Sequence, residues 1–481
     1  MQRWCRFVTV FLSLLLAVFF AAPMAMAADA DFKGVTVKAI TNYEGYAQGF
    51  RMAAEELKQK YNINLEVELT GLGGPDYTKQ MVEFTSSSGA YDIVWMSPVW
   101  MADFARYLEP LEPLAKKWKL DFKLDDIADT FNKVYNSWDG VWYSVPYDGD
   151  VHIFYYNKIA FETPAHKEKF KAKYGYDLHP PDTWKQYHDM AEFFTGWDWD
   201  GDGQVEYGGG ECWKSGMYPF WWYNSRFASY GGVYFDEDMN PLINSPAALR
   251  ALEDMAASKP FYPPGIFTFG SPELKTALYK GDVAMAWHWT STGKLIEDPK
   301  TSDVVGKFGF GITPGVEYEG KIYRRPAFAS GYSLAINKFS KNKDAAAHVL
   351  HFYSSPEVSL KRVIDPQTAS DPFRVSHFES EEFRNSMTDG GDYLDAIKAT
   401  LPLAFPDIQI PGGKEYAEAL SFEISKVLTG KKKPQAALDA AAKKWNRITR
   451  RFGKDKQKAH WNTQYTAMKK IGIEYKPDIA K

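Results

Sequence analysis

Strand and helix patterns alternate near the N-terminus, and this order constrains the fold more than any other feature of the sequence. Residues 35–40, 65–69 and 91–96 are short and read as strands. Residues 48–61 carry apolar side chains at helical spacing, and residues 77–88 are predicted to form a more polar helix. Strand, helix, strand, helix and strand in this order predict a doubly wound α/β sheet.

Polar and aromatic residues follow the predicted strands at their carboxyl ends. Asn42 and Tyr43 come after the first strand, and Ser97 and Trp100 come after the third. Ligands of open α/β sheets bind beyond the carboxyl ends of the strands. We therefore expect these four residues to contact a ligand.

The chain of 481 residues is longer than one hydrophobic core supports, so two domains are expected. Residues 142–157 form an aromatic stretch interrupted by Asp148-Gly149-Asp150, which we interpret as a strand passing between lobes through a hinge. Residues 327–337 read as another strand, which precedes a helix at 341–353, and residues 365–375 are interpreted as a proline-rich crossing. The predicted segments are a first lobe from 28–148 and 328–372, and a second lobe from 149–327 and 373–481.

The first residues have the layout of a secretory signal peptide. Arg3 and Arg6 precede an apolar run, and Ala25-Met26-Ala27 is a small-x-small cleavage site. We predict a signal peptide over residues 1–27 and a periplasmic mature protein; the alternative is a retained N-terminal anchor. Cys5 precedes the apolar run, which argues against a lipoprotein, and Cys212 has no partner for a disulfide after cleavage.

The formal net charge of -4 argues against nucleic acid or an anionic membrane as the main partner. Aromatic residues make up 16% of the chain, and Trp and Tyr suit cores, interfaces and carbohydrate sites alike. The aromatic candidates for stacking on a sugar are Trp100, Tyr147, Trp221, Trp222, Tyr223, Trp287 and Trp289. A core position is the alternative for each tryptophan. Asp148, Asn224 and Arg374 are the predicted polar partners of ligand hydroxyl groups.

Residues 198–206 match the first half of an EF-hand loop. Asp198, Asp200 and Asp202 occupy positions one, three and five, and a glycine stands at position six. Gln204 would add its backbone carbonyl and Glu206 a further oxygen. Position twelve is glycine instead of glutamate, so the motif is incomplete. We predict a structural Ca²⁺ site, and an acidic turn without metal is the alternative; no other cofactor is expected.

Several short motifs together resemble the extracellular solute-binding protein family 1, the maltose-binding-protein-like group. They are Tyr91-Asp92-Ile93-Val94, Val145-Pro146-Tyr147, Pro181-Asp182-Thr183-Trp184, Lys280-Gly281-Asp282-Val283 and Gly331-Tyr332-Ser333-Leu334. The resemblance implies a periplasmic-binding-protein fold of the class II type, with two α/β lobes joined by hinge crossings. It also implies delivery of the ligand to the membrane permease of an ABC importer. One departure is Ser330-Gly331, where the family usually has paired glycines.

Two functions compete. The first is a monomeric binder without chemistry of its own, which captures a sugar, polyol or short oligosaccharide for an importer; a chemosensory ligand presenter overlaps with it. The second is a secreted glycoside hydrolase, which needs two carboxylates about 5–9.5 Å apart. Asp148 and Asp150 are the only pair we could nominate. The sequence lacks a dense Arg or Lys cluster near the candidates, which favours a neutral ligand, although Arg374 leaves an acidic sugar open.

Overall fold

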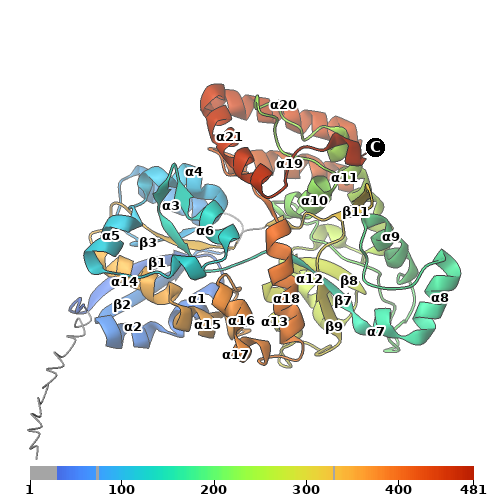
Figure 1. Cartoon of the computed structure of the whole chain (residues 1–481), viewed down its shortest axis with the longest axis horizontal. Coiled ribbons are helices and arrows are strands. Elements are labelled where there is room, and N and C mark those ends of the chain that lie inside the picture. The colour runs from blue at the N-terminus through green and yellow to red at the C-terminus, as the bar shows by residue number, and fades with distance from the viewer. Residues whose placement is uncertain (1–29, 72–74, 329–330, 481) are drawn as a thin grey trace, which may run out of the picture.

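The computed structural model describes residues 30–71, 75–328 and 331–480 and shows an α/β molecule with two lobes side by side (Figure 1). The predicted two-lobed fold is thus confirmed. The predicted signal peptide, residues 1–27, lies outside the described residues. Within the described ranges, no helix has both the length and the apolar character needed to cross a bilayer.

The first lobe is built on a five-stranded sheet with the order β2-β1-β3-β13-β6. Its strands are β1 (Val35–Thr41), β2 (Ile63–Leu69), β3 (Ile93–Met96), β6 (Ser144–Pro146) and β13 (Ser333–Ile336). The first three are parallel, as the alternation of strands and helices predicts, and β13 runs antiparallel to both β3 and β6. A strand from much later in the chain therefore completes this sheet.

Helices pack around this sheet. They are α1 (Glu44–Arg51), α2 (Ala54–Tyr61), α3 (Pro75–Thr85), α4 (Met101–Phe104), α5 (Leu111–Trp118), α14 (Lys343–Ser354) and α15 (Pro356–Ile364). The single helix predicted over 48–61 is wrong, because the chain breaks at Met52 and Ala53 into α1 and α2. Gly49 lets α1 approach Tyr147 and Arg362 closely, so α1 follows the interior of the lobe while α2 follows β2.

The second lobe contains a three-stranded sheet with the order β8-β7-β9, in which the central strand is antiparallel to both neighbours. Its strands are β7 (His152–Asn157), β8 (Met285–Trp289) and β9 (Phe308–Gly311). The remaining helices are α6 (Asp129–Tyr135), α7 (Lys158–Glu162), α8 (Pro164–Tyr174), α9 (Trp184–Phe193), α10 (Tyr218–Ser229), α11 (Pro246–Ala257), α12 (Ser271–Lys280), α13 (Ser291–Ile296), α16 (Val375–Glu379), α17 (Glu381–Arg384), α18 (Gly390–Thr400), α19 (Gly413–Leu428), α20 (Pro434–Phe452) and α21 (Lys454–Lys470). Short strand pairs are β4 (Ser137–Trp138) with β5 (Val141–Trp142), β10 (Val316–Tyr318) with β11 (Lys321–Tyr323), and β12 (Ala327–Phe328) with β14 (Phe405–Pro406).

Each lobe has its own hydrophobic core. Buried side chains of β1, β3, α1 and α14 form one cluster, and a far larger cluster fills the second lobe. The chain passes between the two sheets after β6, between β12 and β13, and after α15. The predicted boundaries lie at or beside these passages; as divisions between folding units they stay predictions.

The crossing segments pack directly on one another at two glycines. A Cβ on Gly149 would lie 2.3 Å from the carbonyl oxygen of Pro372, and one on Gly331 would lie 2.4 Å from that of Asp148. Gly331 also has a φ of +43°, which residues with a side chain rarely adopt. Glycine is therefore required where the three crossings meet.

Candidate ligand site at the lobe junction

On the side of the first lobe, Asn42 and Tyr332 bring polar groups to the carboxyl ends of the strands. The amide nitrogen of Asn42 donates to the Oδ2 of Asp76 and to the hydroxyl of Tyr332, each at 2.8 Å. Asn42 is buried, and its Oδ1 has no hydrogen bond to the described residues. The structure thus places a free acceptor where the sequence predicts a ligand contact. Asp76 and Tyr332 were not predicted.

The other predicted residues of the first lobe differ in exposure. Tyr43 is 39% exposed beside the junction, and Ser97 is partly buried at the end of β3. The Trp100 ring is buried and lies 6.4 Å from the Tyr332 ring. Tyr147 is fully buried, stacks on Phe50 at 4.6 Å and lies under a guanidinium, so it is a core side chain.

Three buried aspartates meet where the crossings pack. Asp148 accepts the backbone N–H of Asp371 at 2.8 Å and the hydroxyl of Tyr46 at 2.7 Å, and one carboxylate oxygen from each of Asp148, Asp150 and Asp371 lies within 4.8 Å of the others. Burial and the neighbouring Asp371 charge raise the pKa of Asp148 to about 7, whereas the Tyr46 hydrogen bond lowers it. Asp148 therefore holds the crossings together.

A lysine of the second lobe faces these acids. Lys275 on α12 donates to the Ser291 hydroxyl at 3.4 Å, and burial lowers the pKa of its ammonium against the opposing effect of Asp371 and Asp150. Lys294 is buried and donates to the carbonyl oxygen of Ser370 at 2.7 Å. The positive charges at the junction are thus those of Lys275 and Lys294. Both lie close to buried carboxylates of the crossings, which already balance their charge.

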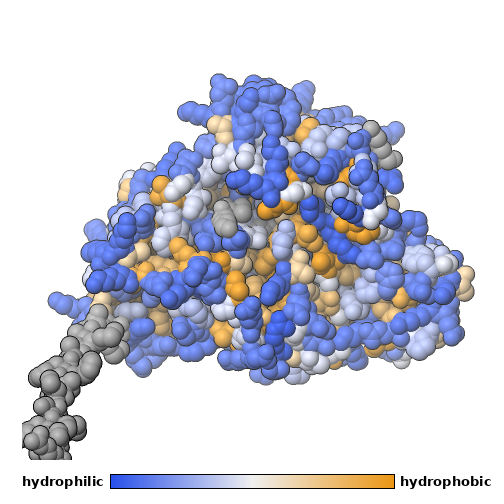
Figure 2. All heavy atoms as spheres, viewed as in Figure 1, coloured by the Kyte–Doolittle hydropathy of each residue, from blue (hydrophilic) through white to orange (hydrophobic). Residues whose placement is uncertain are grey.

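Aromatic side chains of α10 and β8 gather on the side of the second lobe. Trp221 and Trp289 are partly buried with ring centroids 5.4 Å apart, and Trp222 packs edge-on against Trp289 at 5.2 Å. His152 lies 4.7 Å from Trp222, and burial lowers the pKa of His152 to about 3, so it is neutral. Figure 2 shows hydrophobic atoms gathered between the lobes inside a hydrophilic rim. Partly exposed indole faces of this kind can stack on a sugar or polyol.

Trp287 and Asn224 lie inside the second lobe. Trp287 is fully buried and lies 4.9 Å from the guanidinium of Arg226, which is paired with Glu211 and Asp254. Trp287 therefore belongs to the core. Asn224 is buried on α10 and donates to the Tyr234 hydroxyl at 3.0 Å.

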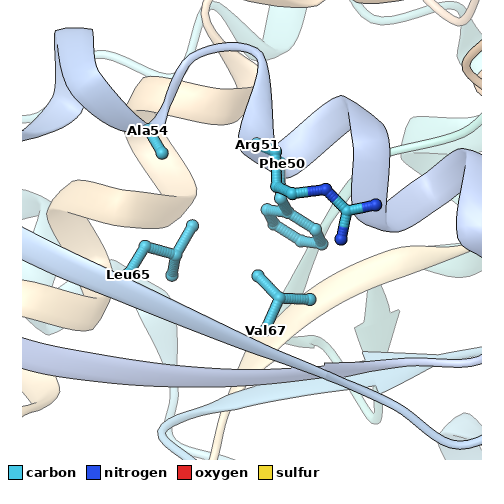
Figure 3. Close-up of a pocket in the computed structure, with 5 residues that line it drawn as sticks. All are labelled: Phe50, Arg51, Ala54, Leu65 and Val67. Carbon is cyan, nitrogen blue, oxygen red and sulfur yellow. The ribbon is translucent and has the colours of Figure 1, made fainter.

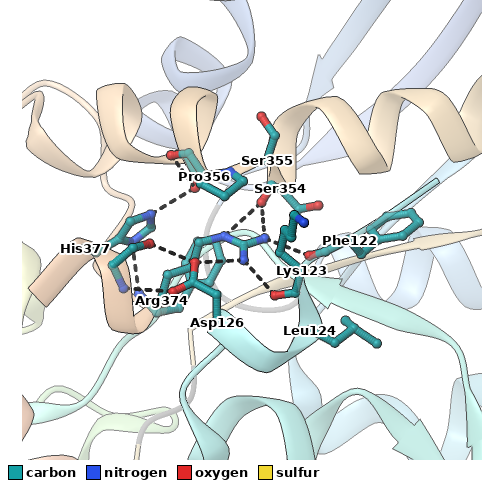
Figure 4. A network of polar contacts seen from close by, with 12 residues as sticks. Phe122, Lys123, Leu124, Asp126, Ser354, Ser355, Pro356, Arg374 and His377 are labelled. Atoms are coloured by element: carbon teal, nitrogen blue, oxygen red, sulfur yellow. Dashed lines mark hydrogen bonds and ion pairs between the residues drawn. The ribbon is translucent and has the colours of Figure 1, made fainter. Parts of the chain in front are cut away.

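Arg374, one of the predicted polar partners of the ligand, makes its hydrogen bonds inside the protein (Figure 4). Its guanidinium donates to the carbonyl oxygens of Ser354, Lys123 and Phe122 at 3.0–3.1 Å and pairs with Asp126 at 3.3 Å. Its side chain is fully buried, so it has no face toward the junction. It ties the end of α14 and the third crossing to the loop after α5.

The predicted calcium loop lies apart from the junction, between α9 and α10. One carboxylate oxygen from each of Asp198, Asp200, Asp202 and Glu206 lies within 4.8 Å of the others. Burial, then the neighbouring aspartates, raise the pKa of Glu206 to about 7 despite a hydrogen bond from the Trp199 N–H. The acidic side chains thus come together as the motif predicts; the side chain of Gln204 points back to Asp202. Hard oxygen ligands in this number suit Ca²⁺.

A shallow pocket of about 180 Å³ on the outside of the first lobe is a separate feature (Figure 3). It lies between the first two helices and β2 and is lined by Phe50, Arg51, Ala54, Leu65 and Val67. None of the predicted ligand residues lines it, and its polar component is one exposed arginine. It is therefore a gap in helix packing and not the candidate site.

Comparison with known proteins agrees with this architecture. A solute-binding protein of Agrobacterium radiobacter K84, solved with ribitol, superposes with a TM-score of 0.74 at 22% identity and covers 87% of this chain and 100% of its own. The maltose-bound MalE3 of T. maritima superposes with a TM-score of 0.70 at 20% identity, over 86% of this chain and 100% of its own. At these identities the likeness shows the fold.

Sequence relatives point the same way. A probable amino-acid ABC transporter periplasmic-binding protein of Sinorhizobium fredii is 23% identical, over 70% of this chain and 73% of its own. The sn-glycerol-3-phosphate-binding periplasmic protein of Escherichia coli K12 is 23% identical, over 73% of this chain and 77% of its own. The family model for bacterial extracellular solute-binding proteins matches residues 41–359, well over half of the chain. This match confirms the resemblance seen in the sequence, and the chain belongs to the bacterial extracellular solute-binding protein family.

Proposed function

We propose that this protein is the periplasmic solute-binding component of a bacterial ABC importer and that it captures a sugar or polyol at the lobe junction. The observation that carries the proposal is the pairing of partly exposed indoles on the second lobe, Trp221 and Trp289, with the free acceptor of Asn42 on the first. The partner that receives the ligand would be a membrane permease. Solved proteins of the same fold hold ribitol, D-mannitol and maltose, which supports this ligand class.

The mechanism we propose is closure of the lobes around the ligand. Aromatic faces would lose water on closure while ligand hydroxyls replace the hydrogen bonds that water gave to buried acceptors. The three crossings form the hinge, because they are the only passages between the two sheets among the described residues. The ligand's higher affinity for the closed state than for the open state then determines the fraction of molecules that are closed.

The glycoside hydrolase alternative has weaker support. Both carboxylate oxygens of Asp148 already accept hydrogen bonds, one from the Asp371 N–H in the third crossing and one from the Tyr46 hydroxyl on α1. A general acid or nucleophile must instead reach the scissile bond. Asp148 and Asp150 thus serve better as hinge residues than as a catalytic pair.

A panel of ligands tests the proposal directly. The mature protein, beginning at Ala28, is titrated calorimetrically with ribitol, D-mannitol, D-tagatose, maltose and amino acids, and each mixture is then checked for product. We expect saturable binding of at least one polyol or sugar without turnover. Binding of amino acids alone would contradict the ligand class, and turnover of an oligosaccharide would establish the enzyme.

We further propose that the acidic loop at 198–206 holds a structural Ca²⁺. The converging carboxylates of Asp198, Asp200, Asp202 and Glu206 support it, with the backbone carbonyl of Gln204 as an additional ligand. A cation there would relieve the repulsion among these acids and fix the loop before α10. The loop is remote from the junction, so the ion would stabilise the lobe and not contact the ligand.

A further inference from the structure

The second half of α20 and the start of α21 form a strongly basic segment. Half of the sixteen residues from 443 to 458 are basic, and one is acidic. The basic residues are Lys443, Lys444, Arg447, Arg450, Arg451, Lys454, Lys456 and Lys458. The chain has a formal net charge of -4, so this segment is opposite in sign to the molecule as a whole.

The basic side chains of α20 point outward because the opposite face of the helix packs inside the second lobe. Trp445 is fully buried, and its indole N–H donates to the carbonyl oxygen of Tyr416 on α19 at 2.8 Å. Side chains three or four positions apart share one face of a helix, so Lys443, Arg447 and Arg450 lie together on the outer face, where all three are exposed. Figure 1 shows α20 at the outer edge of this lobe, and Figure 2 shows hydrophilic atoms over the same corner.

Most of these charges have no acidic partner. Arg451 pairs with Glu415, and Lys458 pairs with Asp238 at 2.7 Å. The other six are exposed and form no ion pair with any residue that the structure describes; we call them the basic face, and they are Lys443, Lys444, Arg447, Arg450, Lys454 and Lys456. At physiological salt, charges are screened over about 8 Å, so the acids of more distant surfaces scarcely weaken the potential at this face.

The composition of the basic face favours a lipid surface over a protein partner. From residue 443 to residue 451 the exposed side chains are all basic apart from Asn446, and no aromatic or aliphatic side chain is exposed among them. Protein interfaces are depleted in lysine and have aromatic or apolar side chains at their centre. A cluster of about four to eight lysines and arginines on an amphipathic helix is instead typical of contact with anionic lipid headgroups.

We propose that the basic face of α20 and α21 docks on the surface of an anionic phospholipid bilayer and holds the protein at the membrane. Lipid phosphates accept hydrogen bonds from the guanidinium and ammonium groups. The helix does not insert, because its apolar side is already packed against α19. All six residues belong to the second lobe, so the inference goes beyond the proposed function and is independent of the ligand. For an importer component, such docking raises its concentration beside a membrane permease.

Sedimentation with lipid vesicles tests the proposal. The mature protein, beginning at Ala28, is mixed with vesicles of phosphatidylcholine alone or of phosphatidylcholine with phosphatidylglycerol. Each mixture is prepared at about 50 mM and at about 500 mM salt, which shortens the screening length severalfold. We expect the wild type to bind the anionic vesicles at low salt, at least about tenfold more weakly at high salt, and the neutral vesicles not at all.

Two variants with the same change in net charge separate the basic face from general charge. The first removes four charges from the basic face by K443Q, K444Q, R447Q and R450Q. The second removes the four exposed lysines of α8 by K167Q, K169Q, K171Q and K173Q. Each basic side chain at an anionic surface strengthens binding about fivefold, so the first variant should bind anionic vesicles at least about tenfold more weakly, whereas the α8 variant should match the wild type.

The outcomes are distinct. A wild type that ignores anionic vesicles would overturn the proposal and indicate an acidic protein partner for this face. Equal binding by the wild type and the basic-face variant would also overturn it, as would binding that high salt does not reverse, since that requires insertion. If the quadruple variant does not fold, the double variant R447Q/R450Q replaces it, with an expected loss of about fivefold or more. Ligand titration without lipid tests the proposed function separately.

Discussion

At the scale of single residues, Arg374 illustrates a charge whose hydrogen bonds are all used inside the fold. Replacing it with methionine would leave buried carbonyl oxygens of Ser354, Lys123 and Phe122 without a donor. At about 1–3 kcal/mol for each unsatisfied buried group, we expect R374M to lose roughly 3 kcal/mol or more of unfolding free energy. Affinity per folded molecule should stay within about threefold. Urea denaturation and calorimetry measure the two effects.

The exposed Arg447 supplies the control, because R447M removes a guanidinium without touching a buried partner. If R374M had normal stability but no longer bound ligand, this would show that Arg374 belongs to the ligand site. The sequence could not distinguish a structural role of Arg374 from a ligand-binding role, because both roles need a guanidinium close to a lobe crossing.

Asp148 makes the stability of the protein depend on pH. Its pKa of about 7 in the fold exceeds the roughly 3.9 of an unfolded aspartate, so the folded protein holds an additional proton between these values. The stability from this group is fully present below pH 4 and is lost as pH rises through 7. The titratable groups that face it are Asp150, Asp371, Tyr46, Tyr147, Tyr332, Lys275, Lys294 and the Arg362 guanidinium.

Asp148→Asn should therefore flatten the decline in unfolding free energy between pH 5 and pH 8. Chemical denaturation at each pH measures it, and Asp344→Asn, at a partly exposed acid of α14 paired with Lys117, is the control. A slope in D148N equal to that of the wild type would show that Asp148 is ionised throughout.

At the scale of elements, local patterns were good predictors of the strands in the first part of the chain. The predicted strands at 35–40 and 91–96 and the predicted helix at 77–88 correspond to β1, β3 and α3 within a few residues. The break between the first two helices was missed; Gly49, three residues before it, packs against residues about 100 and 310 positions away. Non-local contact of this kind leaves no periodic signal.

The crossing segments carry a sharper prediction. Gly149→Ala places a methyl group 2.3 Å from the Pro372 carbonyl oxygen, so backbone must shift where the crossings meet. We expect a melting temperature several degrees lower and weaker ligand binding, since the hinge geometry changes. Gly311→Ala on β9, where a Cβ meets nothing within 4 Å, should change neither. Equal effects of the two substitutions in thermal unfolding would show that the crossings tolerate displacement.

The acidic loop can be tested in the same way. At a Ca²⁺ concentration one hundred times the dissociation constant, binding adds about 2.7 kcal/mol of stability. We expect calcium to raise the melting temperature of the wild type over a chelator-treated sample, and Asp200→Asn to abolish the rise. Asp238→Asn, at an exposed acid paired with Lys458, should retain it. A calcium effect that survives D200N would place the ion elsewhere.

At the scale of the whole molecule, the candidate site depends on contacts between residues that are far apart in the sequence. Asn42 meets Tyr332 across 290 positions. Asn42 could be predicted as a candidate because it follows a strand, and ligands of open α/β sheets bind beyond the carboxyl ends of the strands. Tyr332 and Asp76 were missed, since each becomes part of the junction only when remote segments assemble.

The lobes also contact one another away from the crossings, which determines how readily the molecule opens. The Gly412 N–H donates to Asp103, the Lys414 ammonium lies 5.6 Å from the Tyr77 ring, and the Trp138 and His460 rings are 4.8 Å apart. These contacts exist only when the lobes are together, so they add to the stability of the closed state.

Asp103→Ala should therefore shift the protein toward an open state without removing any proposed ligand contact. Because affinity falls with the population of the competent state, we expect a dissociation constant about 2- to 10-fold higher and, by small-angle scattering, a larger radius of gyration before ligand. Saturating ligand should return D103A to the wild-type radius, since binding energy favours closure. Glu112→Ala, at an exposed helix pair with Lys116, should match the wild type throughout. A D103A protein whose radius and affinity are unchanged would show that the crossings alone hold the lobes together.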